Sequence, residues 1–140
     1  MIFYFQSLSL KLTKLFSECL EVVSAFQNAS SPLLAISVTP TAIFAANANS
    51  KIFKSKNLNS VEKSLQLESK TAQMSSRHDG KILCLGDNEG NISLLTTKSL
   101  KKLAKVQAHS KTVNRILWEE LKFYSFGNDS LVTCFKPYDH

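Results

Sequence analysis

Short apolar runs of about four to eight residues, separated by polar turns, fill the chain from residue 32 onward. Runs of this length with alternating apolar and polar positions are typical of β-strands rather than helices. The pattern predicts three successive groups of strands that recur after about 35 to 40 residues. We expect the first group at 33–38, 43–46, 51–54 and 61–67, the second at 71–76, 82–86, 92–96 and 101–107, and the third at 113–118, 123–126 and 131–135.

Two glycine-containing turns connect neighbouring runs. Asp79-Gly80 joins two apolar runs as a tight hairpin, and Glu89-Gly90 supplies a residue that tolerates a positive φ. Consecutive strands should therefore pair antiparallel. Short antiparallel strands that recur in sets of four favour an all-β fold of propeller blades over a sandwich, whose strands do not repeat as equivalent sets.

The N-terminal segment, residues 1–31, follows a different pattern. Within 5–26 apolar residues recur at intervals of three and four, which predicts a short helix, with a strand followed by a loop as the alternative. Lys11 and Lys14 interrupt the apolar run too early for a signal peptide or for a membrane span of about 20 residues. The remainder is expected to divide into units at about 32–69, 70–107 and 108–140.

Composition is that of an ordinary soluble domain, because 44% of the 140 residues are hydrophobic and 20% are charged. A core at this length requires neither disulfides nor a metal. Cys19, Cys84 and Cys134 are odd in number and lack metal-ligand spacing. We therefore expect reduced, buried cysteines of an intracellular protein, and neither a metal nor another cofactor.

The net charge of +6 makes attraction to polyanions such as RNA plausible. Lysines gather at 51–56 and again at 98–105. The group at 98–105 contains no aromatic residue to stack on bases, so contacts to phosphates are the relevant hypothesis. The alternative is a solvated surface that protects edge strands from pairing. The candidate contacts to RNA or to a protein partner are Lys98, Lys101, Lys102 and Lys105.

The segment 108–137 carries four residues at a distinctive spacing: His109, Ser125, Asp129 and Phe135. It resembles a WD repeat, in which a histidine, a serine or threonine, an aspartate and a tryptophan six residues later form a hydrogen-bonded network. By this resemblance the first three residues keep their roles, whereas Phe135 cannot donate an indole hydrogen bond. A buried imidazole between a carboxylate and a hydroxyl has its polar atoms satisfied and locks the outer turn of a blade.

The preceding unit, 71–107, matches this pattern less closely. Glu89 stands at the place of the aspartate and Leu95 at the place of the tryptophan. We therefore expect the polar network to be largely missing there, so that apolar packing holds this unit.

The run SRHDGKILCLGDNEGNISLL, followed by QAHSKTVNRILW, is similar to the early blades of one WD-repeat family, that of the U-three small nucleolar RNA-associated protein 15, a component of the small-subunit processome. The similarity covers about 26–137. Members of that family fold as a propeller followed by a helical domain and act in pre-ribosomal RNA transcription and processing in the nucleolus. The resemblance implies a ribosome-biogenesis scaffold whose neighbours are other proteins and pre-ribosomal or small nucleolar RNA. It further implies that this chain is a fragment, a truncated gene product or a strongly reduced relative.

No enzyme is indicated. The chain lacks a Walker loop, a dinucleotide glycine fingerprint and an HExxH motif, and Ser125 lies in a strand pattern without a GxSxG turn to expose its hydroxyl. We expect neither a small-molecule substrate nor a membrane. The alternative function is a generic WD-repeat adaptor, cytoplasmic in location, that contacts only proteins. In either case an incomplete propeller should leave apolar blade faces open, so that the isolated chain associates or aggregates.

Overall fold

The computed structural model describes residues 31–138, which form strands and turns throughout. These residues include no helix that could span a membrane. The all-β prediction is confirmed, while the helix expected within 5–26 lies outside the described residues. The strands form two four-stranded sheets and one three-stranded sheet. They are β1 (Leu33–Val38), β2 (Ile43–Asn47), β3 (Lys51–Ser55) and β4 (Lys63–Gln66) in the first sheet, β5 (Thr71–Ser76), β6 (Ile82–Asp87), β7 (Asn91–Thr96) and β8 (Lys102–Gln107) in the second, and β9 (Val113–Glu119), β10 (Lys122–Gly127) and β11 (Val132–Phe135) in the third.

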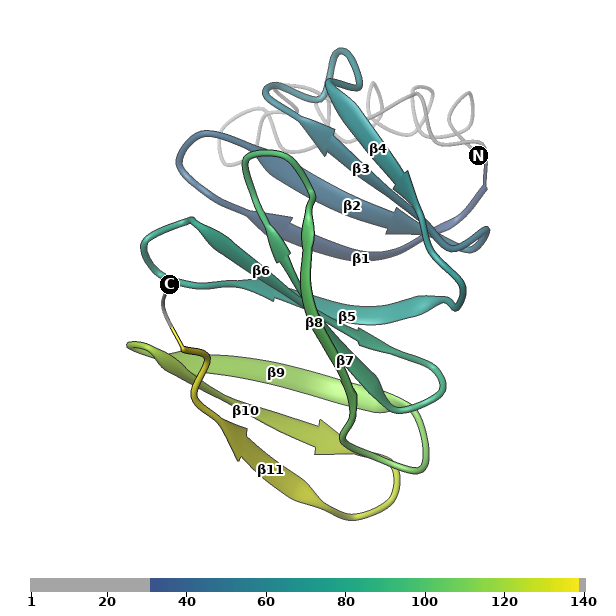
Figure 1. Ribbon diagram of the computed structural model, residues 1–140. Coiled ribbons are helices and arrows are strands. Elements are labelled where there is room, and N and C mark those ends of the chain that lie inside the picture. Colours follow the sequence, from purple (N-terminus) through teal and green to yellow (C-terminus); the bar gives the residue numbers. More distant parts are fainter. Residues whose placement is uncertain (1–30, 139–140) are drawn as a thin grey trace, which may run out of the picture.

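Each sheet is an antiparallel meander in chain order, and the sheets stack face to face (Figure 1). The first strands of the sheets are neighbours, since β1 packs on β5 and β5 packs on β9. The predicted hairpin at Asp79-Gly80 joins β5 to β6, and Gly90 has the predicted positive φ, at 91°. The third group contains the three strands expected from the sequence within the described part of the chain.

Apolar side chains fill both seams between the sheets. Strand β6 is buried on both faces, because it lies in the middle sheet of the stack. Its alternating side chains therefore divide between the two seams: Leu83 and Leu85 join the core against the first sheet, and Cys84 joins the core against the third. The first core is completed by Ala42, Phe44, Ala46, Ile52, Met74, Leu95 and Leu100, and the second by Ile92, Val113, Ile116 and Phe123.

The turn between the second and third strand of each sheet has the same backbone geometry. Ser50, Gly90 and Ser130 have positive φ angles of 64°, 91° and 68° at matching positions. The N–H of each residue donates to the carbonyl three residues earlier, at 3.2 to 3.3 Å. Equivalent positions in the three sheets can therefore be compared directly.

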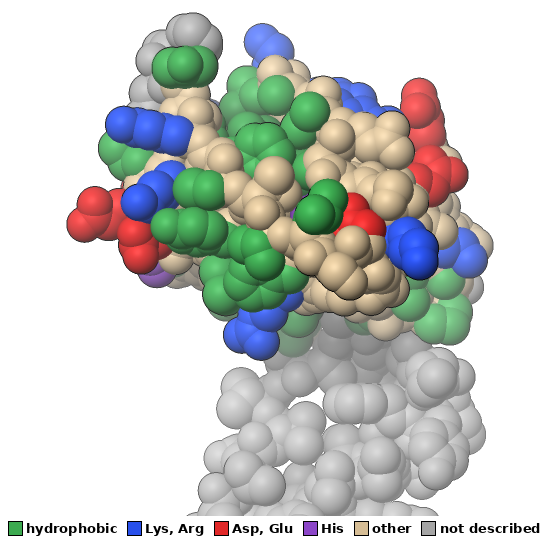
Figure 2. Space-filling view, turned by 90° about the horizontal axis from the view of Figure 1, so that it is seen from below, with side chains coloured by type: hydrophobic (Ala, Val, Ile, Leu, Met, Phe, Trp, Pro, Cys, Tyr) green, Lys and Arg blue, Asp and Glu red, His purple; other side chains and the backbone are tan. Residues whose placement is uncertain are grey.

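The face of the third sheet that points away from the second sheet is partly apolar. The register places Leu117, Tyr124 and Val132 on this face, and Ile116 and Phe123 on the opposite, buried face. Leu117 and Val132 are exposed. Hydrophobic side chains gather on the side of the molecule where β9–β11 lie (Figure 2). Within residues 31–138 nothing covers this face as the third sheet covers the second.

Candidate functional site

The structure brings His109, Ser125 and Asp129 together around one turn of the third sheet. His109 lies in the connection between β8 and β9, Ser125 lies in β10, and Asp129 lies in the turn from β10 to β11. His109 Nδ1 is 2.9 Å from Asp129 Oδ1, and His109 Nε2 is 2.8 Å from Ser125 Oγ. Because a carboxylate only accepts, Nδ1 donates to Asp129, and Nε2 faces the serine hydroxyl.

Thr133 is a further member of this network, which the repeat pattern did not indicate. Its Oγ1 lies 3.0 Å from Ser125 Oγ and 3.2 Å from His109 Nε2. Thr133 is directly opposite Ser125 in the β10–β11 ladder. Strand alternation after Asp129 could have identified it, because residues that pair across strands present their side chains on the same face.

Phe135 takes part in packing and not in hydrogen bonding. Its ring stacks on Phe123 with the ring centroids 5.2 Å apart, and Phe123 in turn contacts Trp118 at 4.9 Å. The indole donor of the third sheet is Trp118, whose Nε1 donates to the carbonyl of Ser75 in the second sheet at 3.1 Å. Phe135 therefore closes the apolar end of the site, while Thr133 extends its polar end.

Asp129 ties the turn to the incoming chain. Its carboxylate accepts the N–H of Ser110 at 2.9 Å and that of Leu131 at 3.2 Å. Burial opposes ionisation, but the hydrogen bonds from Ser110, His109 and Leu131 outweigh it and hold the pKa of Asp129 below its ordinary value. The carboxylate and the imidazole thus form a hydrogen-bonded pair whose side chains are 5% and 0% exposed.

Gly127 makes room for this arrangement. A Cβ at this position would lie 2.5 Å from His109 Nδ1 and 2.6 Å from Asp129 Oδ1. Both distances are well inside van der Waals contact. Any side chain at residue 127 would therefore displace the histidine or the aspartate.

The second sheet ties the same turn with a different residue. Asp87 Oδ1 accepts the N–H groups of Glu89 and Asn91 at 2.9 and 2.8 Å, and its Oδ2 accepts Ser69 Oγ and Asn91 Nδ2. Glu89, at the place of the aspartate, is exposed. The expectation that packing alone holds this unit is therefore wrong, because the polar tie comes from a residue two positions earlier.

The first sheet uses the same device as the second, with an amide in place of the carboxylate. Asn47 Oδ1 accepts the N–H groups of Asn49 and Lys51, both at 3.0 Å. Its Nδ2 is buried and has no partner among the described residues. Asn47 and Asp87 both match Gly127 by their place before the turn residue of positive φ.

The geometry of the His109 network is suited to holding the turn in place. Ser125 is fully buried and His109 is 2% exposed, so no reacting atom of the His-Ser-Asp set is open to a substrate. Burial raises the pKa of the Cys84 thiol, which disfavours a nucleophilic thiolate. Residues 31–138 contain no group of three or more side chains placed to hold a metal ion.

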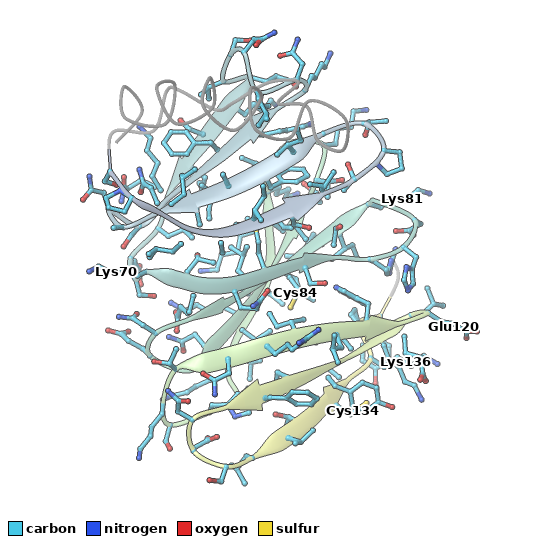
Figure 3. All side chains as sticks on the ribbon, turned by 180° about the vertical axis from the view of Figure 1, so that it is seen from behind. Lys70, Lys81, Cys84, Glu120, Cys134 and Lys136 are labelled. Carbon is cyan, nitrogen blue, oxygen red and sulfur yellow. The ribbon has the colours of Figure 1, made fainter. Side chains whose placement is uncertain are left out.

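The cysteines differ from one another. Cys84 lies inside the stack between sheets, as expected, whereas Cys134 lies on the outer strand β11 (Figure 3). The expectation that Cys134 is buried is wrong, because the alternation of β11 places it on the outward face of the third sheet. Cys19 lies outside the described residues.

The four predicted lysines are exposed along the outer edge of the second sheet. Lys98 and Lys101 lie in the turn from β7 to β8, and Lys102 and Lys105 lie on β8. Lys105 Nζ is 3.5 Å from Glu68 Oε2. The edge position fits both hypotheses from the sequence, a contact surface and protection of an edge strand.

Comparison with known proteins gives the fold a context. Residues 28–121 match the family model described as anaphase-promoting complex subunit 4 WD40 domain. A solved structure of U3-55K has a TM-score of 0.76 at 21% identity and covers 81% of this chain, which covers 38% of that one. A crystal structure of RRP9 WD40 repeats has a TM-score of 0.75, also at 21% identity and with the same coverage. At this identity the likeness shows the fold, an incomplete WD40 propeller whose blades are the three sheets.

A short stretch also matches curated proteins by sequence. Gem-associated protein 5 from Mus musculus and from Homo sapiens is 39% identical over 46 residues. These residues are 33% of this chain and 3% of those proteins. The chain therefore spans a small part of the curated relatives and less than two fifths of the solved neighbours.

Proposed function

Because the chain belongs to a WD40 family, that of the anaphase-promoting complex subunit 4 WD40 domain, we propose that it is a scaffold. We propose further that this scaffold acts in ribosome biogenesis. The WD40 repeat fold is typically a non-enzymatic platform for protein contacts. The finer assignment is to the small-subunit processome and pre-ribosomal RNA processing in the nucleolus. The neighbours of the chain there would be processome proteins together with pre-ribosomal or small nucleolar RNA.

The observation that carries the scaffold role is the division of polar groups between interior and surface. The His109 network is sealed inside the third blade, and its donors and acceptors are used to hold one turn. The surface, by contrast, presents lysines on β8 and an apolar outward face on β9–β11. Such surfaces serve association, because exposed apolar patches and basic stripes favour macromolecular partners.

Two further points favour ribosome biogenesis over other scaffold roles. The runs at 76–95 and 107–118 resemble the processome family, and the structure places them in the second blade and at the start of the third. One structural neighbour, U3-55K, also carries the U3 designation in its name. The net charge of +6 suits an RNA-rich environment.

The exposed outward face of the third blade favours a second candidate, a WD40 adaptor that contacts only proteins and resides in the cytoplasm. Purification of the tagged full chain from cells separates the two functions. Pre-ribosomal RNA with nucleolar proteins is the result expected for the scaffold of ribosome biogenesis. A different protein complex, free of that RNA, would overturn it in favour of the adaptor.

A His109→Ala variant is the control for this purification. It keeps the formal net charge of the chain while removing the tie of the third blade. RNA that is retained through charge alone will accompany both chains equally. Partners that need the folded blade will be lost with the variant.

A further inference from the structure

Two lysine groups that are far apart in the sequence meet at the seam between the first and second blades. Lys54 Nζ donates to the carbonyl of Lys98 at 3.0 Å, across 44 positions of the chain. At this seam a cleft of about 200 Å³ is lined by Lys54, Lys56 and Lys98, together with Thr41, Ala42, Glu62 and Thr97. We propose that this cleft binds a phosphate group of an RNA backbone.

Lys54 is buried beside this cleft. It lies on the face of β3 that packs on the second blade, as Ile52 does, and only 9% of it is exposed. An ammonium group has three donors, and the Lys98 carbonyl accepts from one of them. Among residues 31–138 no carboxylate lies within ion-pair distance of Lys54. A charge withdrawn from water in this way is stabilised by an anionic partner.

The walls of the cleft are held in place before any ligand arrives. Thr97 is anchored twice, since its N–H donates to Lys81 O at 3.1 Å and its hydroxyl donates to Gly80 O at 2.5 Å. Leu100 has a φ of 57° and places its side chain in the core between the blades. The turn that carries Lys98 is therefore preorganised, which lowers the entropic cost of binding.

The charge of this cleft differs from that of its neighbour. Three lysines against one glutamate leave the Lys54 cleft with an excess of positive charge. A second cleft, lined in part by Leu100, contains Lys102 and Lys105 but also Glu68 and Asp87, and Lys105 is close to Glu68. Of the four lysines predicted from the sequence, only Lys98 therefore lines the cleft that favours an anion.

The residues around the cleft favour RNA over a single phosphorylated group. Lys101 and Lys102 continue the positive charge along the exposed β7–β8 hairpin. A polymer with a phosphate at every unit can contact the cleft and these lysines together, whereas a phosphopeptide or a lipid headgroup would occupy the cleft alone. Contacts of this type position a backbone without reading bases. The inference rests on the proposed function in that it takes RNA as the ligand.

The test compares two double variants of the full chain that lose the same charge. Lys56→Gln with Lys98→Gln alters the cleft but keeps the Lys98 carbonyl that holds Lys54. The control, Lys111→Gln with Lys136→Gln, removes two exposed lysines, one just before β9 and one just after β11. Affinity for a labelled oligouridine is measured against salt. If both cleft lysines contact phosphate, the salt slope of the cleft variant falls by about 1.4, whereas the control slope stays close to that of the unaltered chain.

Inorganic phosphate gives an independent readout. Its titration should shift the amide resonances of Thr97 and Lys98 in the unaltered chain and not in the cleft variant. Equal salt slopes for the two double variants would overturn the proposal, as would preferred binding of a phosphopeptide or of vesicles containing phosphoinositide. Co-purification separates this failure from failure of the proposed function: a cleft variant that still recovers pre-ribosomal RNA overturns the cleft alone. An unaltered chain that binds oligouridine through the cleft but recovers no such RNA overturns only the ribosomal role.

Discussion

The second and third blades tie the same turn with two arrangements that exclude each other. In the third, His109 and Asp129 meet over Gly127, and a Cβ on that glycine would collide with both. In the second, Asp87 stands at the position of the glycine and accepts the backbone N–H groups of the turn itself. The comparison shows that the backbone shape of the turn is the same in both blades, while the side chain that accepts hydrogen bonds from its N–H groups can change.

The connections that lead into the second and third blades differ in length, and this difference accounts for the two arrangements. Four residues, 67–70, precede β5, whereas five residues, 108–112, precede β9. The longer connection places an imidazole over the turn, and the shorter one brings Ser69 Oγ to Asp87 instead. The residue at the start of the turn is therefore matched to the length of the incoming connection. We expect that changing this residue without the connection lowers the free energy of unfolding.

Gly127→Asp breaks this match most severely. The new side chain would enter the space of His109 and Asp129 and add a second carboxylate there, so we expect a loss of about 3 to 5 kcal/mol in the free energy of unfolding. Urea denaturation measures the loss.

His109→Ala alone should lower the free energy of unfolding by about 2 to 4 kcal/mol, because it leaves a cavity and polar atoms without partners.

The double variant distinguishes competition for space from general fragility. With the imidazole removed, an aspartate at residue 127 can accept the N–H groups of the turn as Asp87 does. Gly127→Asp with His109→Ala should therefore cost clearly less than the two single losses added together, with a coupling of at least about 1 kcal/mol. If the two losses in free energy of unfolding were strictly additive, the aspartate at residue 127 and the imidazole of His109 would not compete for the same space.

Asp87→Ala is the corresponding change in the second blade. It removes the acceptor of four hydrogen bonds, which should cost about 1 to 3 kcal/mol. Glu89→Ala is the matched control, because Glu89 occupies the place of the aspartate but is exposed, and its loss should stay within about 0.5 kcal/mol. A larger loss of stability for Glu89→Ala than for Asp87→Ala would show that Glu89, the residue that the repeat pattern indicates, holds the turn.

The sequence predicted the fold well because strand alternation and turn residues are local signals. The strands begin and end close to the expected positions, and Gly80 and Gly90 have the positive φ that their turns require. The same locality explains why His109, Ser125 and Asp129, which follow one repeat spacing, lie within hydrogen-bond distance of one another.

What the sequence could not provide depends on register and on contacts between blades. Asp87 was missed because repeat position indicated Glu89, and the one-residue difference in the incoming connection is visible only once the strands are paired. Thr133 requires the β10–β11 register. The meeting of Lys54 with Lys98 depends on how two blades stack, which no local pattern encodes.

Thr133→Val tests the added member of the third network with a smaller effect. The substitution keeps the branched shape and removes a hydroxyl that lies within hydrogen-bond distance of Ser125 and His109, so we expect a loss of about 0.5 to 1.5 kcal/mol. Ser93→Ala at the matching position of β7 is the control and should cost less. Similar losses at the two sites would indicate that Thr133 contributes through packing alone.

The smallest expected effect is the acid dependence of the Asp87 tie. Burial would raise the pKa of Asp87, but hydrogen bonds from Ser69, Asn91 and Glu89 outweigh it, so its pKa in the folded chain lies below the ordinary 3.8. The stabilisation is therefore complete above that ordinary value and is lost as the pH falls through the folded pKa. Asp87→Asn reproduces the amide of the first blade, where Asn47 leaves its Nδ2 without a partner among the described residues. The unaltered chain should therefore be more stable than this variant at neutral pH, and the difference in stability should shrink below about pH 4. Urea titrations at a series of pH values measure this difference. A difference that stays constant with pH would mean that the charge of Asp87 does not stabilise the turn.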